Sequence, residues 1–425
     1  MSRALRVWWD GVCVGQLTLD EHGDLGFSYQ PDWAADARRP AISVALPKRE
    51  EPYGRRAARA FFSGLLPEES QREGAARALG VSKNNDFRLL EELGGDVAGA
   101  LTLWPADEEP PAPQGLAASK PLSDARLLEI LDTLPMRPLL AGEHGLRLSL
   151  AGAQQKLPVV LVNGAVALPE PGQPSTHILK PPIAALPGSA ENEAFAMRLS
   201  AALGLPTAGV ELRRTANRPY LLVERYDRQL ESEGAIRRLH QEDFCQALGI
   251  QPENKYASEG GPIFKNCFDL VRRACDQPAV AVLQLLNAAL FNLIVGNADA
   301  HGKNFSLLYA DGGRAMAPLY DLMCTAAYPG VHKGLAMKIG KRSTLEEFTP
   351  DTFAVFAKEI GVGAPYAVRT ARAMAATAHE AASTVAEEIA AAGFQTQLLQ
   401  ELAEIVRARA DRVLELTTKP QAPGG

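Results

Sequence analysis

The sequence has few cysteines, little net charge and no signal-like apolar start. Its five cysteines, in 425 residues, form no C-x-x-C pair. This spacing argues against a disulfide framework or a thiolate zinc site and indicates a reducing compartment. The formal net charge is -6, so the overall charge does not attract nucleic acid or anionic lipid. Contact with DNA would therefore need a local patch or a partner protein.

Segments for export or membrane insertion are also lacking. The N-terminal stretch "MSRALRVWWDGVCVG" has no apolar core of the kind found in signal peptides. The most apolar stretch, residues 279–295, contains Gln284, Asn287 and Asn292. It is also shorter than the roughly 20 residues that a membrane span needs. We predict that it is a buried helix in a cytoplasmic protein without membrane contact.

The first 105 residues have the pattern of a separate module. Short strand patterns fill residues 4–29, helical patterns follow around 56–65 and 67–79, and a strand returns near "ALTLWP". The next segment, "ADEEPPAPQG" at 106–115, is rich in proline and acidic residues and is predicted to be a linker. A length of 425 residues suggests two or three domains in all.

Residues 116–226 are predicted to form an α/β half. Two apolar runs are joined by Asn163-Gly164, a strong hairpin signal because both turn residues need positive φ. A third strand, "HILK", ends at Lys180, and a helix follows that is predicted to be capped by Ser189 and to end at Gly204. Two more strands, "GVELRRT" and "PYLLVERYD", complete the order strand, strand, strand, helix, strand, strand.

Residues 227–425 are predicted to be mostly helical. The expected helices cover residues 241–248, 266–275, 279–295, 350–360, 366–392 and 395–416. The exception is a hairpin: "FSLLY" at 305–309, the turn "ADGGR", and "AMAPLYD" ending at Asp321. The predicted fold class is therefore α+β, with an α/β half before a helical one.

The stretch "GNADAHGKNF", residues 296–305, places a polar cluster directly after the apolar helix. A calcium loop is disfavoured because Leu308 stands at the twelfth position, where a bidentate Glu is needed. Zinc needs three or four ligands, and only Asp299 and His301 are at hand. No G-x-S-x-G supports a Ser-His-Asp hydrolase.

Phosphoryl transfer fits this cluster better. Asp299 and Asn304 have the five-residue spacing of a kinase catalytic loop, in which the Asp is the base and the Asn holds a metal. Lys303 is predicted to neutralise charge on the transferred phosphoryl group. The hairpin after Asn304 returns the chain to Asp321, so these carboxylates and the amide can converge on Mg²⁺.

The α/β half supplies the nucleotide-binding elements of such a kinase. A loop over Ala151–Lys156 would cover the phosphates, Lys180 would contact them, and Glu193 would pair with that lysine, with Glu191 as second choice. Glu224–Tyr226 would be the hinge whose backbone meets adenine. Each element has an ordinary alternative, such as a solvated lysine or a helix-capping carboxylate. Their order along the chain favours the kinase.

Several long motifs resemble the HipA family of toxin kinases: "LSLAGAQQK", "HILKP", "NEAFAMRLSAALGL", "LLVERYDR", "KYASEGGP", "GNADAHGKNFSLL" and "PLYDLM". The resemblance implies a protein-kinase-like two-lobed fold with an extra N-terminal module. It also implies an ATP- and Mg²⁺-dependent Ser/Thr protein kinase that is the toxin of a type II toxin–antitoxin pair. The implied protein substrate is an aminoacyl-tRNA synthetase. The implied partner is a helix-turn-helix antitoxin (HipB-like) through which the kinase would reach DNA.

The resemblance also carries residue roles onto matching positions. Asp299 would be the catalytic base, helped by Lys303, and Asn304 and Asp321 would hold Mg²⁺. Ser149 matches the family's autophosphorylation position, where phosphate ejects the loop and inactivates the kinase. The implied nucleotide-binding residues are Ala151, Gly152, Ala153, Gln154, Gln155, Lys156, Lys180, Glu224, Arg225, Tyr226, His301, Asn304, Tyr320 and Asp321.

Two alternatives stay open at this point. In the first, the chain is a kinase-like corepressor scaffold that acts with a DNA-binding antitoxin. In the second, it is a small-molecule kinase. "YDLM" stands where a typical protein kinase has Asp-Phe-Gly, and no Ala-Pro-Glu segment follows, so activation-loop phosphorylation is not the expected switch. The basic run "HKGLAMKIGKR" at 332–342 is either a solvated loop or a contact for the target or for DNA.

Overall fold

The computed structural model describes residues 3–143, 145–310 and 312–418. Its contacts divide the chain into two compact units. Unit 1 comprises Met1–Pro181, Arg213–Glu253 and Leu308–Gly313, and unit 2 comprises Pro182–Leu212, Asn254–Leu307 and Arg314–Gly425. The predicted boundaries at residues 105, 115 and 226 stay predictions. One residue of the predicted turn "ADGGR", Asp311, lies outside the described residues.

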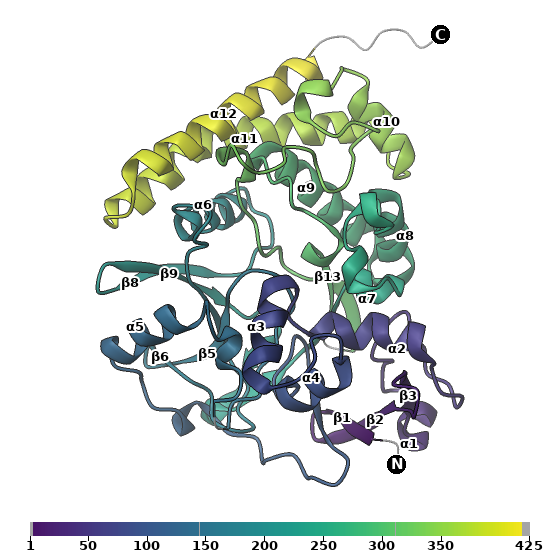
Figure 1. Cartoon of the computed structure of the whole chain (residues 1–425). Helices are drawn as coiled ribbons and strands as arrows, with labels where there is room; N and C mark the ends of the chain where they lie inside the picture. Colours follow the sequence, from purple (N-terminus) through teal and green to yellow (C-terminus); the bar gives the residue numbers. More distant parts are fainter. Residues whose placement is uncertain (1–2, 144, 311, 419–425) are drawn as a thin grey trace. The chain divides into compact units, whose positions relative to one another are not determined.

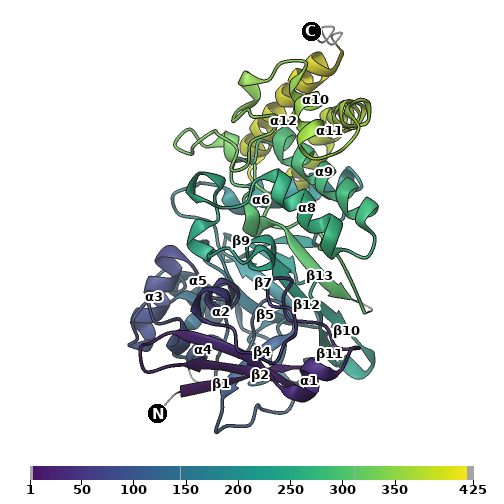
Figure 2. The same ribbon diagram turned by 90° about the vertical axis from the view of Figure 1, so that its right-hand side faces the viewer.

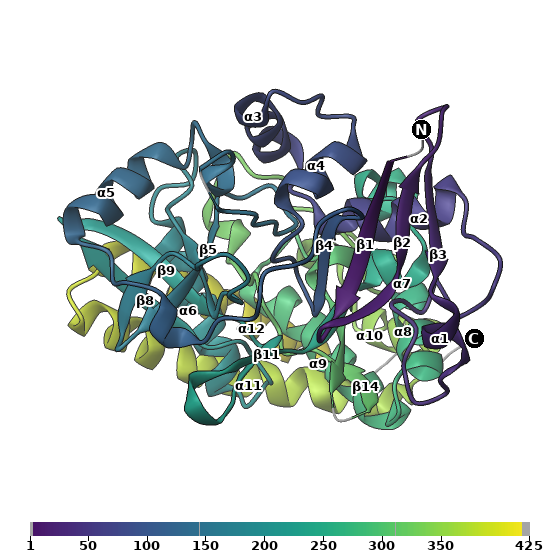
Figure 3. The same ribbon diagram turned by 90° about the horizontal axis from the view of Figure 1, so that it is seen from below.

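The N-terminal part of unit 1 is an antiparallel sheet covered by helices. Figure 3 shows β1 (Arg3–Trp9), β2 (Val12–Leu19), β3 (Leu25–Tyr29) and β4 (Leu101–Pro105), in the order β3-β2-β1-β4. The helices are α1 (Pro31–Ala35), α2 (Arg55–Phe62), α3 (Glu69–Leu79) and α4 (Asp86–Leu93). Alternate strand residues, such as Leu5 and Val7, are fully buried in one core with Phe61 and Phe87. The predicted strands and helices of this segment are confirmed.

A second, five-stranded sheet has the order β6-β5-β7-β9-β8. Its strands are β5 (Leu157–Val162), β6 (Ala165–Ala167), β7 (His177–Lys180), β8 (Val210–Thr215) and β9 (Arg218–Glu224). Asn163 and Gly164 have φ of 52° and 80°, so the predicted hairpin turn is confirmed. The helix α5 (Asp124–Thr133) packs Leu127 and Ile130 against buried Leu157 and Leu179 of this sheet (Figure 2 shows α5 and the strands).

The helix after Lys180, α6 (Ser189–Ala202), is where predicted, but Ser189 does not cap it. Gly188, with φ 70°, is the N-cap residue. The Ser189 hydroxyl instead accepts a hydrogen bond of 2.6 Å from the Ile183 main-chain N–H. A Cβ at Gly188 would lie 2.1 Å from Leu398, so glycine takes the cap position and the serine binds the preceding loop.

Besides α6, unit 2 contains α8 (Phe264–Ala274), α9 (Pro278–Val295), α10 (Thr352–Glu359), α11 (Ala364–Ala391) and α12 (Thr396–Thr418). Figure 1 shows α11 and α12 side by side along their length. Buried alanines on α11, among them Ala371, Ala378 and Ala382, allow this close approach. By length and composition α9 passes the test for a membrane span, yet 61% of it is buried inside the protein. That burial is typical of a core helix, as predicted.

Three predicted boundaries are wrong. The strand "PYLLVERYD", residues 219–227, ends at Glu224 as β9. Residues 241–243, expected at the start of a helix, belong to the strand β12 (His240–Asp243) before α7 (Phe244–Leu248). His240 and Glu242 are buried two residues apart, which is a strand period, and Asp243 caps the helix by accepting from the Gln246 N–H. The strand predicted to reach Asp321, β14 (Gly313–Met316), ends earlier because Pro318 cannot donate to a ladder.

The remaining strands are short. β12, β13 (Ser306–Ala310) and β14 form a three-stranded sheet in that order. β10 (Arg228–Leu230) pairs with β11 (Ile236–Arg238) as an antiparallel ribbon.

Unit 1 contains a buried network of charges. Asp96 lies 3.2 Å from the guanidinium of Arg225 and 2.9 Å from that of Arg228, and Asp227 lies 2.8 Å from Arg225. Burial alone would raise the pKa of Asp96, but Arg228 and Arg225 outweigh it and hold that pKa well below its usual range. Removing one partner of such a network leaves an uncompensated buried charge.

Candidate active site

The polar cluster begins where α9 ends, within unit 2. Gly296 has φ 77° and follows the last residue of α9. A Cβ there would lie 2.8 Å from Ala326, so glycine suits both the conformation and the space. Arg409 donates to the Leu293 carbonyl at 2.8 Å and satisfies one of the last carbonyls of the helix. The helix therefore provides a fixed starting point for the loop.

Side chains then hold the main chain around Asp299. The Asp299 N–H donates to Asn297 Oδ1 at 3.1 Å, and Asn297 Nδ2 donates to Asn292 Oδ1 at 2.8 Å. The Ala298 N–H donates to Thr325 Oγ1 at 2.8 Å. Asp299 itself is exposed. Its backbone is thus held in place while its side chain lies at the surface.

Tyr256 is a site residue that the sequence did not identify. Its hydroxyl donates to Asp299 Oδ1 at 2.7 Å. Its ring meets that of His301 edge to face, with centroids 5.0 Å apart. Tyr256 lies in the quoted motif "KYASEGGP", but a separation of 43 residues from Asp299 gives no spacing signal. Only the fold brings the two together.

His301, predicted to contact the nucleotide, supports the loop. Its Nδ1 accepts a hydrogen bond from the Lys303 N–H at 3.3 Å. Its own N–H donates to Asn304 Oδ1 at 3.2 Å. The three residues Gly302–Asn304 form one 3₁₀ turn that His301 caps. A contact between His301 and a phosphate stays a prediction.

Asn304 and Asp321 do converge, as the hairpin predicted. Asn304 Nδ2 lies 3.1 Å from Asp321 Oδ2. Asp321 has φ 57°, a left-handed conformation that is uncommon for a non-glycine residue and is enriched at functional sites. The neighbouring Tyr320 hydroxyl donates to the Lys303 carbonyl at 2.7 Å, so the two ends of the hairpin are tied together.

The oxygen atoms of Asn304 and Asp321 are suitable ligands for a hard cation. Asn304 and Asp321 offer amide and carboxylate oxygens, which Mg²⁺ prefers over nitrogen or sulfur. Over the described parts of the chain, no cluster of three or more His, Cys, Asp or Glu side chains has metal-binding geometry. An all-protein cage is therefore not found there. A Mg²⁺ ion held by one or two side chains with phosphate oxygens needs no such cage.

The predicted phosphate loop, Ala151–Lys156, lies in unit 1. Gly152 has φ 109°, and a Cβ there would lie 2.6 Å from Lys156 Nζ. Lys156 Nζ donates to the Ala151 carbonyl at 2.6 Å, and the Glu68 N–H donates to the Gly152 carbonyl at 3.1 Å. The loop is thus tied by its carbonyl oxygens to its own lysine and to the N-terminal part of unit 1.

Ser149, the predicted autophosphorylation residue, is fully buried at 0% exposure. Its hydroxyl donates to the Leu65 carbonyl at 2.7 Å, and its N–H donates to the Asp96 carbonyl at 3.0 Å. In this conformation no kinase can reach the hydroxyl. The segment before the phosphate loop must leave its place before Ser149 can accept phosphate.

The other predicted nucleotide residues are distributed over both units. Lys180 ends β7 and is 5% exposed. Glu193 lies buried in α6 of unit 2, so its pairing with Lys180 stays a prediction. In the predicted hinge, Arg225 has its N–H bonded to the Thr176 carbonyl and its carbonyl bonded to the Arg228 N–H. Because both groups are used, Glu224 and Tyr226 are better candidates for contacting adenine.

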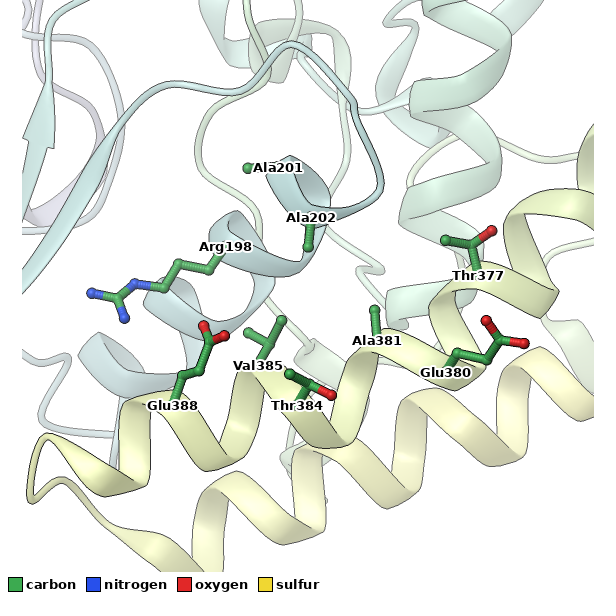
Figure 4. A pocket seen from close by; sticks show the side chains of 9 residues that line it. All are labelled: Arg198, Ala201, Ala202, Thr377, Glu380, Ala381, Thr384, Val385 and Glu388. Atoms are coloured by element: carbon green, nitrogen blue, oxygen red, sulfur yellow. The ribbon is translucent and has the colours of Figure 1, made fainter.

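A groove of about 600 Å³ lies between α6 and α11 (Figure 4). Its lining residues are Arg198, Ala201, Ala202, Thr377, Glu380, Ala381, Thr384, Val385 and Glu388. None of these was predicted to take part in phosphoryl transfer. Arg198 and Glu388 lie near each other at one end of the groove and Glu380 lies at the other, with small side chains between them (Figure 4).

The chain is similar to known proteins over most of its length. The family model for the HipA-like C-terminal domain matches residues 148–390, and that for the HipA N-terminal domain matches residues 5–104. "Putative kinase Y4mE" of Sinorhizobium fredii is 56% identical over 97% of this chain and 98% of its own. The serine/threonine-protein kinase toxin HipA of Shewanella oneidensis is 31% identical over 81% of this chain and 79% of its own.

A solved structure extends the comparison to the fold. HipA of Shewanella oneidensis, in its complex with HipB and operator DNA, matches with a TM-score of 0.84 at 27% identity, over 98% of this chain and 100% of that chain. The predicted α+β, kinase-like fold is therefore confirmed. The chain belongs to the HipA family, whose matched relatives are named as kinases.

Proposed function

We propose that this protein transfers the γ-phosphoryl group of ATP to a serine or threonine hydroxyl of a protein. The observation that carries the proposal is the exposed Asp299 carboxylate on a rigid loop, followed by Asn304 in contact with Asp321. Asp299 accepts the proton of the attacking hydroxyl. Tyr256 is a positioning residue that orients Asp299 through its 2.7 Å hydrogen bond.

Asn304 and Asp321 would hold Mg²⁺ in this proposal, through the oxygens that make them suitable ligands. When bound, the ion neutralises phosphate charge during transfer. Lys303 adds a positive charge in the same turn and is 8% exposed. A charge in such a partly water-excluded position acts more strongly on the phosphoryl group than one in bulk water.

ATP recognition rests on the predicted residues of unit 1. The loop Ala151–Lys156 offers backbone N–H groups and the Lys156 ammonium to phosphates, and Lys180 offers a second ammonium. The positive φ of Gly152 places its backbone in a conformation that other residues rarely adopt. Glu224, Tyr226 and Tyr320 complete the proposed nucleotide contacts. Glu193 is proposed to pair with Lys180.

The burial of Ser149 supports our proposal that phosphorylation of this residue inactivates the kinase. A phosphoserine adds about -1.5 to -2 charge. The position has 0% exposure, and the hydroxyl bonds to a carbonyl oxygen, so a phosphate cannot return there. Once Ser149 carries phosphate, its segment and the attached phosphate loop stay displaced, and the loop no longer covers ATP. This is the regulation that we propose for the chain.

The biological role is proposed at the level of the family. We place the chain as the toxin of a type II pair that phosphorylates a protein in the cytoplasm, with an aminoacyl-tRNA synthetase as the predicted target. The structural relative stands in a complex with HipB and operator DNA. By analogy, a helix-turn-helix antitoxin binds this chain, and DNA is reached through that partner.

The test is incubation of the purified protein with Mg²⁺ and [γ-³²P]ATP, followed by mass spectrometry. Phosphate on Ser149, absent in Asp299→Asn, is the expected result. If the wild-type protein forms no phosphoprotein and no ADP, the corepressor scaffold is the better description. Phosphoproteomics after brief induction separates a protein kinase from a small-molecule kinase, because only the former raises phosphoserine or phosphothreonine on a second protein.

A further inference from the structure

A basic hairpin, residues 332–343, has no role in the function described so far. Its turn is Gly340-Lys341, between Ile339 and Arg342, which exchange hydrogen bonds of 3.1 and 3.0 Å. Further back, the Leu335 N–H donates to the Ser343 carbonyl at 2.7 Å. The segment is therefore an ordered hairpin rather than a loosely solvated loop.

The hairpin is anchored beside the catalytic loop of the same unit. Met337 is 2% exposed and its sulfur lies 3.8 Å from Cys267 Sγ, while Ile339 is 1% exposed. The Ala336 N–H donates to the Ala298 carbonyl at 2.9 Å. Ala298 directly precedes Asp299. Backbone bonding thus places the basic hairpin next to the residue proposed to act on the acceptor hydroxyl.

Four cations of the hairpin are exposed: Lys333, Lys338, Lys341 and Arg342. None of the ion pairs formed within 4 Å among the described residues includes them. The nearby carboxylates include Glu346, Glu347 and Asp299, and Glu347 accepts from the Ser343 N–H at 2.8 Å. That main-chain bond is the first cause, and Arg342 and Lys338 further causes, of the lowered pKa of Glu347. The four cations outnumber these carboxylates and leave a positive surface on a chain of net charge -6.

Lys341 stands in an unfavourable backbone conformation. It has φ 69° and follows Gly340 with φ 55°, so the turn needs positive φ at both residues, where Gly or Asn is preferred. Glycine is required at 340, where a Cβ would lie 2.4 Å from the Thr352 carbonyl oxygen. No comparable steric requirement explains a lysine at position 341. A charged side chain at a locally unfavourable position is typical of a functional site.

We propose that this basic hairpin binds an acidic stretch of the protein substrate, close to the residue that receives the phosphate. The proposal rests on the function proposed above, because it takes Asp299 as the place where the acceptor hydroxyl arrives. An acidic peptide fits better than nucleic acid for two reasons. The positive surface is small, and residues 332–343 contain no Phe, Tyr or Trp on which bases could stack.

The test uses two serine peptides of equal length, one flanked by Asp and Glu and one by Asn and Gln. The wild-type protein is expected to phosphorylate the acidic peptide with at least tenfold higher kcat/KM at low salt, with the preference falling as salt screens the charges. Lys338→Ala, Lys341→Asn and Arg342→Ala together should reduce the preference to below threefold. The matched control, Lys358→Ala with Arg369→Ala, removes two exposed charges of the same unit and should change nothing.

The single variant Lys341→Asn controls for effects that come from misfolding and not from the lost charge. Asparagine tolerates positive φ better than lysine, so thermal stability should stay equal or rise while acidic-peptide binding weakens about threefold. Binding is measured by anisotropy of fluorescein-labelled peptides and needs no phosphoryl transfer. A protein that binds the acidic peptide but transfers nothing overturns the proposed function alone.

Two results would overturn the hairpin proposal. One is equal binding of the acidic and neutral peptides by the wild-type protein. The other is a triple variant that keeps its peptide preference but loses affinity for labelled duplex DNA or tRNA, which would make the hairpin a nucleic-acid contact.

Discussion

The two loops proposed to act on phosphate are held in different ways. The loop at 296–304 in unit 2 is fixed by side chains: Asn297 bonds to Asn292, Thr325 receives the Ala298 N–H, and Asn304 contacts Asp321. The loop Ala151–Lys156 in unit 1 is held mainly through carbonyls, by Lys156 and by the Glu68 N–H. One loop is part of a buried framework, and the other rests on a few bonds at its own backbone.

This difference matches different tasks. A general base needs a fixed position, since small displacements of a reacting group cost large factors in rate. A loop that covers a nucleotide must admit and release it on every cycle, which requires a low cost of opening. The comparison therefore predicts that substitutions near residue 299 change the rate of phosphoryl transfer. Substitutions near residue 150 are predicted to change how readily the phosphate loop opens.

The largest expected effect is that of Asp299→Asn. Loss of the proton acceptor should lower kcat/KM for protein phosphorylation about 10²–10⁴-fold, with an unchanged melting temperature because the backbone bonds remain. The assay is transfer from [γ-³²P]ATP. Asp351→Asn, an exposed acid at the start of α10, is the control and should keep full activity. Full activity in Asp299→Asn would remove this loop from the mechanism.

Asp96→Asn should have the largest effect on stability. It leaves Arg225 and Arg228 without their shared carboxylate in a buried site, which costs about 3–5 kcal/mol. Urea unfolding measures the loss. The exposed pair Arg218–Asp132 gives the control, and Asp132→Asn should cost below about 1 kcal/mol.

Glu242→Gln tests the interior of unit 1 through pH. Burial raises the pKa of Glu242 to about 7, above its usual 4.5, despite hydrogen bonds from Ser43 and Tyr309. A raised carboxyl pKa stabilises the folded state fully below the unfolded pKa, and this stabilisation is lost as pH rises through about 7. The loss is about 3 kcal/mol between pH 4.5 and 8.

In Glu242→Gln this pH dependence should disappear. The measurement is the free energy of unfolding in urea at several pH values. The contribution of His240 to stability has the opposite dependence on pH. Burial lowers its pKa to about 4, so its contribution to the free energy of unfolding is lost as the pH falls. Because the His240 contribution is common to both proteins, the difference between the wild-type and Glu242→Gln slopes between pH 5 and 8 isolates Glu242. A variant with the wild-type slope there would contradict the assignment.

Tyr256→Phe should have a moderate effect, about tenfold on kcat, because Asp299 loses one donor to its charged form. The acid limb of the pH–rate profile should move to higher pH, which a purely structural role would not cause. Melting temperature serves as the control. An unchanged profile with lowered stability would show that Tyr256 only packs against His301.

The smallest expected effect is that of Ser149→Ala. It removes one hydrogen bond to the Leu65 carbonyl, worth about 1 kcal/mol, so amides of residues 147–156 should exchange about fivefold faster. It also removes the proposed acceptor, so activity in Mg-ATP should persist after the wild-type protein has stopped. Equal exchange rates in both proteins would contradict the proposed opening of this segment.

Local patterns predicted the elements well. The Asn163-Gly164 turn and the apolar run of α9 needed only neighbours in sequence. The errors at Ser189 and at 241–243 arose where a distant group decided: Leu398 excludes a Cβ at Gly188, and the partner strand β13 recruits β12. Short segments with mixed signals are settled by tertiary contacts rather than propensity.

The candidate site followed the same rule. The pairing of Asn304 with Asp321 was predictable because one hairpin connects them. Tyr256 was not, since it reaches Asp299 from 43 residues away. The strain at Asp321 and Lys341 is likewise invisible in the sequence, because it depends on φ angles that the surrounding fold imposes.

Asp96 also has a consequence for synthesis of the chain. It lies 129 residues before Arg225, and at about 5–20 residues per second the ribosome needs about 6 to 26 seconds to make that stretch. Unit 1 further includes Leu308–Gly313. During translation the Asp96 carboxylate has no arginine partner until Arg225 and Arg228 have been synthesised. Unit 1 cannot fold completely until most of the polypeptide has been made.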